Sequence, residues 1–428
     1  MKLNEWYKKR GIQFVFQRAK RLGQRYGAGA GKAMARINDT VDELDQFDCH
    51  PTFFVPAVVA RRNLDYIRGL QSRGCEIGVH GYQHVDLKSY PAAESSAQLM
   101  RAVESFKELG LEVHGFRCPY LSSSDELLRK LPAKVFKYSS NKAIGWTHQH
   151  RGTQQPAIMF EKIEEFYQPM PADSTLCLPW MQDGMVEVPV CVPDDLQMYD
   201  GLSYSVEEMS SAWVDILRIT QQKGDLFNLI FHPELAALCN APFIDVLKEA
   251  RTKPNSVWVA PLRDIGDWWL EKEAFRVEIE RQHGGFLLNL LHTPRGTVLY
   301  RGFEVRQPSL DWDGHYRRLL SDRLEISGPT LPLIKLESGL PDWAAPALRG
   351  MGYITLAESE TYSGSLTIGR KCVEEFSNPV LLREHIESSE VPLVRFWPWP
   401  DGQRSALCLT GDLDALSLAD YATRLFVN

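Results

Sequence analysis

Residues 75–84, CEIGVHGYQH, decide the fold. The segment CEIGV reads as a short buried strand, and His80 and His84 follow it at a spacing of four. Two histidines at this spacing lie on one face of a single helical turn, so both can ligate one metal ion. Chance pairs are common, but sites in parallel α/β folds gather at the carboxyl ends of strands. We therefore predict an α/β fold with a metal site after this strand.

Strand-like and helical segments alternate around this stretch, from about residue 33 to residue 275. PTFFVPA (residues 51–57) has the pattern of a buried strand, and SSAQLMRAVESFKELG (residues 95–110) that of a long amphipathic helix. Such alternation predicts a parallel sheet with crossover helices. Roughly seven or eight β-α units fit, which favours a barrel over an open sheet.

The pattern changes along the chain and predicts four segments. Residues 1–32 form a basic helical segment, and residues 33–275 form the main part of the barrel. Residues 276–400 begin with short strands and glycine turns, as in an antiparallel β module, and continue as a mixed accessory region. Residues 401–428 return to the strand-then-helix pattern of the barrel.

Composition restricts the class of protein. The chain has 428 residues, 44% of them hydrophobic, and a net charge of -7. This mild acidity argues against a nucleic-acid binder, because no half of the chain is strongly basic. Its eight cysteines form no C-x-x-C pair, which predicts packed, reduced thiols. Without a signal peptide or a long apolar run, a cytoplasmic location is expected. The basic N-terminal segment either contacts an anionic membrane surface or docks on the core.

Three further strand ends carry chemically useful side chains. Arg117 in GFRCPY could orient a carboxylate through its planar fork, although a surface ion pair is the plainer alternative. His232 in LIFHPE is placed for general acid work, or is simply a satisfied histidine. Asp194 or Asp195, after VPVCV, could orient that histidine and raise its pKa, or form an ordinary Pro-Asp turn.

A pair of carboxylates, Asp412 and Asp414, follows the strand-like SALCL near the end of the chain. One carboxylate could bind a metal ion while the other takes a proton from metal-bound water. An isolated D-x-D is more often an Asp-rich turn or a helix cap. The pair indicates a catalytic site only when it is considered together with the other segments.

Together these segments resemble the NodB-type polysaccharide deacetylases, a carbohydrate esterase family. PTFFVPA is similar to that family's A-T-F-F-V strand, and CEIGVHGYQH to its H-(S/T)-x-x-H motif, although Gly81 replaces the usual Ser or Thr. The resemblance implies a distorted (β/α) barrel of NodB type with an added β-rich module. It also implies that His80 and His84 are metal ligands.

The same resemblance assigns roles to the other motifs. GFRCPY is similar to the family's R-x-P-Y, so Arg117 would anchor the catalytic base and the Tyr120 amide would help to hold the oxyanion. VPVCVPDD is similar to the fourth motif, with Asp194 and Asp195 as alternatives, and LIFHPE to the last, which makes His232 the catalytic acid. All these matches follow the family's order.

One motif of the family is displaced. The family opens with T-F-D-D or F-D-x-D on its first strand, but a helical segment precedes PTFFV here. The missing element resembles ALCLTGDLDAL at the other end, with Gly411 where an aromatic residue often stands. Asp412 would then be the general base and Asp414 the third metal ligand. This order is that of a circularly permuted domain, which is tolerable because domain termini usually lie close together.

The resemblance implies a metal-dependent hydrolase that removes an N-acetyl or O-acetyl group from an amino sugar or glycan precursor. Two histidines and one carboxylate form a zinc-like catalytic set, so Zn²⁺ is the expected cofactor, with Co²⁺, Ni²⁺ or Mn²⁺ as alternatives. The metal ion would activate water and polarise the acetyl carbonyl.

Three alternatives stay open at this point. A cyclic imide or ureide hydrolase of related fold would use similar ligands. A non-catalytic carbohydrate-binding pseudoenzyme would lack the metal ion. In an oligomer, Asp412 and Asp414 could also come from a neighbouring protomer.

Overall fold

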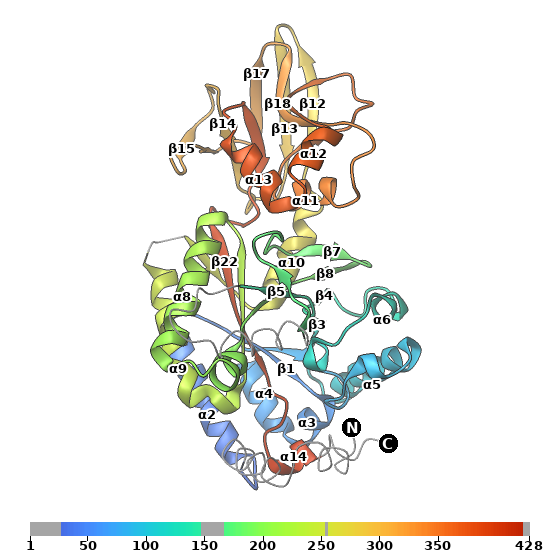
Figure 1. Cartoon of the computed structure of the whole chain (residues 1–428), viewed down its shortest axis with the longest axis vertical. Coiled ribbons are helices and arrows are strands. Elements are labelled where there is room, and N and C mark those ends of the chain that lie inside the picture. Colours follow the sequence, from blue (N-terminus) through green and yellow to red (C-terminus); the bar gives the residue numbers. More distant parts are fainter. Residues whose placement is uncertain (1–26, 147–166, 253–255, 423–428) are drawn as a thin grey trace.

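The computed structural model describes residues 27–146, 167–252 and 256–422, and the predicted N-terminal segment lies largely outside them. The chain forms an α/β body and a β-rich module above it (Figure 1). Among the described residues, no helix is long and apolar enough to cross a membrane. All eight cysteines are free thiols, and seven of them are buried, as predicted.

The α/β body is built on a curled sheet in which twelve described strands pair in the order β6-β5-β9-β10-β22-β1-β2-β3-β4-β8-β7, with β11 beside β22. Every pairing in it is parallel except that of β7 with β8. The predicted distorted barrel is therefore confirmed. The strands are β1 (Thr52–Val55), β2 (Glu76–Val79), β3 (Gly115–Phe116), β4 (Tyr138–Ser139), β5 (Ala143–Gly145), β6 (Met170–Pro171), β7 (Trp180–Gln182), β8 (Met185–Glu187), β9 (Val190–Val192), β10 (Leu226–Phe231), β11 (Val257–Val259) and β22 (Ser405–Asp412).

Helices cover the outer face of this sheet (Figure 1). Local sequence sets their ends: in α8, Ser205 and Glu208 form a capping box, and Gly224 ends the helix in the left-handed region. The helices are α2 (Gly31–Asp45), α3 (Ala57–Arg62), α4 (Leu64–Ser72), α5 (Ala92–Glu108), α6 (Asp125–Lys130), α8 (Val206–Lys223), α9 (Ala236–Arg251), α10 (Leu262–Lys272) and α14 (Leu418–Ala422), with single turns at η1 (Leu87–Ser89), η2 (Pro119–Leu121), η3 (Gln197–Gly201) and η4 (Pro233–Leu235).

Strand β22 lies in the middle of the sheet, between β10 and β1, although it comes last in the chain. All eight of its residues are buried. Gly411 is required there, because a Cβ atom at this position would lie 2.8 Å from the Phe53 ring and 3.0 Å from Phe231. Just beyond the strand, the Leu418 amide donates to the Gly27 carbonyl over 3.1 Å. The two ends of the described chain therefore meet.

The β-rich module contains three smaller sheets. The first two are antiparallel, as the sequence predicted, whereas β18 pairs with β19 and β20 in parallel. Its elements are β12 (Arg276–Gln282), β13 (Gly285–Leu291), β14 (Val298–Arg301), β15 (Ser309–Asp311), β16 (Arg317–Leu319), β17 (Arg323–Ser327), β18 (Thr330–Leu336), α11 (Ala344–Gly350), β19 (Thr355–Leu356), β20 (Ser363–Ile368), α12 (Arg370–Glu375), α13 (Pro379–Ser388) and β21 (Leu393–Phe396).

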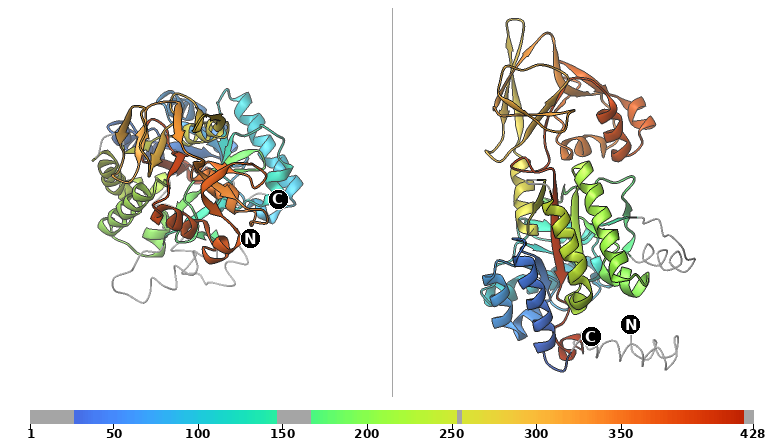
Figure 2. Two further views of the ribbon diagram at one scale, coloured as in Figure 1. Left: turned by 90° about the horizontal axis from the view of Figure 1, so that it is seen from above. Right: turned by 90° about the vertical axis from the view of Figure 1, so that its left-hand side faces the viewer.

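The module joins the α/β body at the amino ends of the parallel strands. Arg383 of α13 forms a buried ion pair with Asp225, just before β10, at 2.7 Å. The Trp399 indole nitrogen donates to the neighbouring Gly224 carbonyl over 2.8 Å. The module therefore stands at the opposite end of the sheet from the carboxyl ends of β1, β10 and β22 (Figure 2).

Glu76 is buried at the amino end of β2. Its carboxylate accepts hydrogen bonds from the Thr52 hydroxyl (2.7 Å), the Tyr138 hydroxyl (2.8 Å) and the Arg263 amide (2.8 Å). These donors favour the charged form, but burial outweighs them and raises the pKa of Glu76 from 4.5 to about 7.

This shift makes stability depend on pH. A carboxyl group whose pKa is higher in the folded chain stabilises the fold fully below its unfolded pKa, and that stability is lost as pH rises through the folded pKa. Between pH 4.5 and about 7, the loss at Glu76 amounts to about 3 kcal/mol of unfolding free energy. We expect Glu76→Gln to flatten this part of the profile in denaturant titrations. The exposed Glu278→Gln control should follow the parent, and equal slopes in all three proteins would contradict the prediction.

Candidate active site

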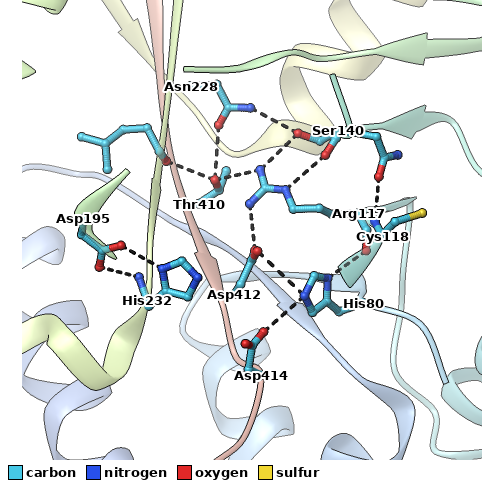
Figure 3. A network of polar contacts seen from close by, with 12 residues as sticks. His80, Arg117, Cys118, Ser140, Asp195, Asn228, His232, Thr410, Asp412 and Asp414 are labelled. Atoms are coloured by element: carbon cyan, nitrogen blue, oxygen red, sulfur yellow. Dashed lines mark hydrogen bonds and ion pairs between the residues drawn. The ribbon is translucent and has the colours of Figure 1, made fainter. Parts of the chain in front are cut away.

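The side chains singled out in the sequence lie together at the carboxyl edge of the sheet (Figure 3). His80 follows β2 and Arg117 follows β3, while Asp412 ends β22 and Asp414 lies two residues beyond it. His232 follows β10. Parallel pairing brings these strand ends to one edge, although residues 117 and 412 are 295 positions apart in sequence.

A compact donor cluster forms at the centre of this edge. The Asp414 Oδ1 atom lies 3.0 Å from His84 Nε2 and 3.3 Å from His80 Nε2. The three ligand atoms lie within 4.8 Å of one another. Tetrahedral ligands about 2.0–2.1 Å from one zinc ion are themselves roughly 3.3 Å apart. The donor set therefore suits a metal ion of this kind.

The predicted helical turn between the two histidines is wrong. Residues 80–86 form an irregular loop, because Gly81 has a φ of 79° and turns the chain out of helical geometry. A Cβ atom at Gly81 would also lie 3.0 Å from the Gln83 carbonyl oxygen. The Ser or Thr usual at this place in the family would be strained here. The loop nevertheless brings both imidazole rings to the cluster, with centroids 5.1 Å apart.

A hydrogen bond at Nδ1 fixes the orientation of the His80 ring. Its Nδ1 atom lies 2.8 Å from the Arg117 carbonyl oxygen, which can only accept, so Nδ1 carries the proton and donates it. The lone pair of Nε2 then points toward Asp414. A backbone acceptor behind a histidine is the usual way to hold a metal ligand in one tautomer.

Arg117 is fully buried and connects the Asp412 carboxylate to polar side chains of the sheet. Its Nη1 donates to Asp412 Oδ1 over 2.8 Å, and its Nη2 donates to the hydroxyls of Thr410 (2.9 Å) and Ser140 (3.1 Å). Thr410 in turn contacts Asn228, whose side-chain nitrogen also donates to Ser140 (Figure 3). No sequence motif indicates this neutral layer, although Thr410 lies two residues before Asp412.

A second acid–histidine pair lies beside the first cluster. The carboxylate of Asp195 accepts twice from His232, from Nδ1 at 2.8 Å and from the backbone amide at 2.7 Å. Of the two alternatives, Asp195 is therefore the partner of His232. Asp194 instead accepts from the Gln197 amide over 2.7 Å. Burial raises the pKa of Asp194 to about 7, against the opposing charge of His232.

Two tyrosines border the site. Tyr120 lies in η2 with a φ of 61°, and its half-exposed ring packs edge-on against His84 with centroids 4.6 Å apart. Tyr167 was not anticipated, because the surrounding sequence carries no motif. Burial, followed by the charges of Asp194 and Asp412, holds the pKa of the Tyr167 hydroxyl well above its ordinary value. Tyr167 therefore stands close to both carboxylates in its protonated form.

Comparison with known proteins bears on this arrangement. A family model described as polysaccharide deacetylase matches residues 29–137. A putative polysaccharide deacetylase from Mycobacterium smegmatis is 20% identical, with a TM-score of 0.43, over 60% of this chain and 83% of that one. A probable polysaccharide deacetylase from Pseudomonas aeruginosa is 17% identical, with a TM-score of 0.43, over 60% and 76%. PuuE allantoinase is 17% identical, with a TM-score of 0.42, over 55% and 72%. No curated protein matches the chain.

The chain folds as a distorted α/β barrel, and residues 29–137 of it match the polysaccharide deacetylase family model. This match supports a deacetylase activity. This confirms the resemblance of the histidine and arginine motifs, which lie inside the matched residues. Residues 405–414, which bring the two aspartates, lie outside the match.

Proposed function

We propose that the protein is a metal-dependent deacetylase that removes an acetyl group from an amino sugar or glycan precursor. The observation that carries the proposal is the meeting of His80, His84 and Asp414 beside an Asp412 carboxylate held by Arg117. A divalent ion, with zinc the best fit to two imidazoles and one carboxylate, would polarise the acetyl carbonyl and acidify a bound water molecule.

The side chains of this chain divide the remaining work. Asp412 accepts the proton of the attacking water, and the buried guanidinium of Arg117 holds its carboxylate in one orientation. His232 delivers a proton from Nε2 to the leaving amine or alcohol, because Asp195 holds its Nδ1 and so fixes the orientation of the ring. The Tyr120 amide contributes to the oxyanion site.

We infer that the catalytic domain is circularly permuted. In support, β22 occupies a central place between β10 and β1, and the Leu418 amide reaches Gly27, just before α2. A chain that began at β22 and continued into α2 would then have the family's usual order. Both aspartates reach the histidines from within the same chain, so the proposed site does not require a second protomer.

The function is tested by measuring released acetate from N-acetylglucosamine oligomers and from O-acetylated xylan, with the protein loaded with Zn²⁺, Co²⁺, Ni²⁺ or Mn²⁺. We expect acetate release that a chelator abolishes and added metal restores. Ring opening of allantoin or hydantoin without acetate release would instead support the ureide hydrolase. A protein that binds no metal and releases no acetate would support the pseudoenzyme.

The pair formed by Asp195 and His232 gives a separate prediction. Without the carboxylate, the imidazole can adopt the wrong tautomer or rotate, so Asp195→Asn should lower kcat by about 10²- to 10³-fold. KM and metal content should change little, because neither residue belongs to the His80 cluster. Asp215→Asn, at an exposed position of α8, is the control and should retain full activity. An unchanged kcat in Asp195→Asn would remove His232 from the proposed acid step.

A further inference from the structure

A cavity of about 290 Å³ opens at the base of the β-rich module. It lies between the end of α10, the edge strand β12 and the strands β18 and β19, so it belongs to the module and not to the catalytic edge. Its size is at the lower end of the range for small-molecule pockets, about 300–1,000 Å³. Much of its wall is apolar and is formed by Phe275, Val277, Ile279, Leu333, Leu356 and Phe396.

One face of the edge strand β12 contributes to the apolar wall. Along β12, exposed charged residues alternate with Val277 and Ile279, which pack against the core of the module, stay only partly buried and line the cavity. An apolar ligand in the cavity would cover the part of these two side chains that the core leaves open.

Positive charge is concentrated at the same cavity. Lys272 is buried in its wall, where Nζ donates to the Gly350 carbonyl over 2.7 Å and lies 4.1 Å from the centre of the Trp269 ring. Arg276 and Arg349 also line the cavity, are exposed, and form no ion pair within the described part of the chain. Two acidic residues, Glu273 and Glu360, also line the cavity, and Glu360 accepts a hydrogen bond from the Ala357 amide. The three basic side chains therefore outnumber the two carboxylates around the cavity.

We propose that this cavity binds a small amphipathic anion, with its carboxylate or phosphate head at Lys272, Arg276 and Arg349 and its apolar body against β12 and Phe396. Burial, with the charge of Arg395 and against that of Glu273, lowers the pKa of Lys272 to about 7. An anion beside Nζ would restore the charged form. The inference is independent of the proposed deacetylation, because the module stands at the far end of the sheet from Asp412.

Calorimetric titration of the whole protein with four probes tests the proposal. Octanoate and octyl phosphate carry both the head and the chain, octanol lacks the charge, and acetate lacks the chain. We expect one site for at least one of the two amphipathic anions, with octanol at least about tenfold weaker and acetate without measurable binding. The stronger of the two anions identifies the head group. Equal affinity for octanol and octanoate, or no binding of either anion, would overturn the proposal.

Substitutions in the cavity test whether the anion binds there. Lys272→Met keeps an apolar stem of similar length and should weaken the preferred anion at least about tenfold. Arg370→Met, on the exposed surface of α12 and outside the cavity, should bind as the parent does. If Lys272→Met fails to fold, the exposed Arg349→Gln still tests the rim, with a several-fold loss expected. Unchanged binding in the folded cavity variants would place the anion elsewhere and refute the assignment.

Discussion

Replacing Asp412 by asparagine is expected to lower kcat for acetate release by about 10³-fold while the bound metal stays. The asparagine side chain is nearly the same size, so it can keep its place between Arg117 and the cluster, but it cannot accept a proton from water at neutral pH. Arg117 donates to Asp412 Oδ1, and an amide oxygen can accept the same hydrogen bond. The variant therefore isolates proton acceptance from folding and from metal binding.

The measurement pairs acetate release with metal content by atomic emission and with the melting temperature. Asp420→Asn is a useful comparison, because Asp420 is also a buried aspartate after β22 and pairs with Arg62, away from the histidines. We expect that variant to lose some stability but to retain most of its activity per folded molecule. Full activity in Asp412→Asn would show that another group accepts the proton.

Replacing Asp414 by alanine is expected to weaken metal binding by more than about 100-fold and to lower activity by at least about 10³-fold at limiting metal. Asp414 supplies a carboxylate oxygen, Oδ1, that lies within 3.3 Å of the Nε2 atoms of both His80 and His84. Its loss leaves two neutral nitrogen donors, which hold a divalent ion poorly. Excess metal should restore part of the activity of Asp414→Ala, and this partial rescue separates it from Asp412→Asn, which excess metal cannot restore.

Two further variants test whether His80, His84 and Asp414 form the metal site. His84→Ala should behave like Asp414→Ala in metal titrations, because both remove one donor of the same cluster. His232→Ala should keep its metal and lose turnover. If Asp414→Ala and His84→Ala both retain full metal content, the cluster is not the metal site, whatever their activities.

Much of this edge could be predicted because strand ends leave a strong signal. An apolar run followed by histidine, arginine or aspartate marks a carboxyl end, and parallel pairing brings such ends together, as with His80, Arg117 and Asp412. The loop between His80 and His84 could not be predicted, because a single glycine with positive φ decides between a helical turn and an irregular one. Thr410, Ser140 and Asn228 were also missed, since neutral polar residues in strands carry no such mark.

The end of the sheet to which the β-rich module attaches could not be predicted from the sequence either. Sequence patterns show that residues 276–400 differ from the barrel, but not to which end of the sheet they attach. The attachment depends on contacts between distant residues, such as Arg383 with Asp225 and Trp399 with Gly224. The four predicted segment boundaries stay a prediction, while the parallel sheet of β18, β19 and β20 departs from the antiparallel pattern before it.

The central place of β22 has a consequence for biosynthesis. When the ribosome has made β1 and β10, the strand that belongs between them does not yet exist, and both present open hydrogen-bonding edges. Pairing between strands so distant in sequence, such as Thr52 of β1 with Thr410 of β22, is slow, so the incomplete sheet is exposed to aggregation or to chaperone binding. The same delay leaves the nascent protein without Asp412 and Asp414, and hence without the complete proposed site, until β22 inserts.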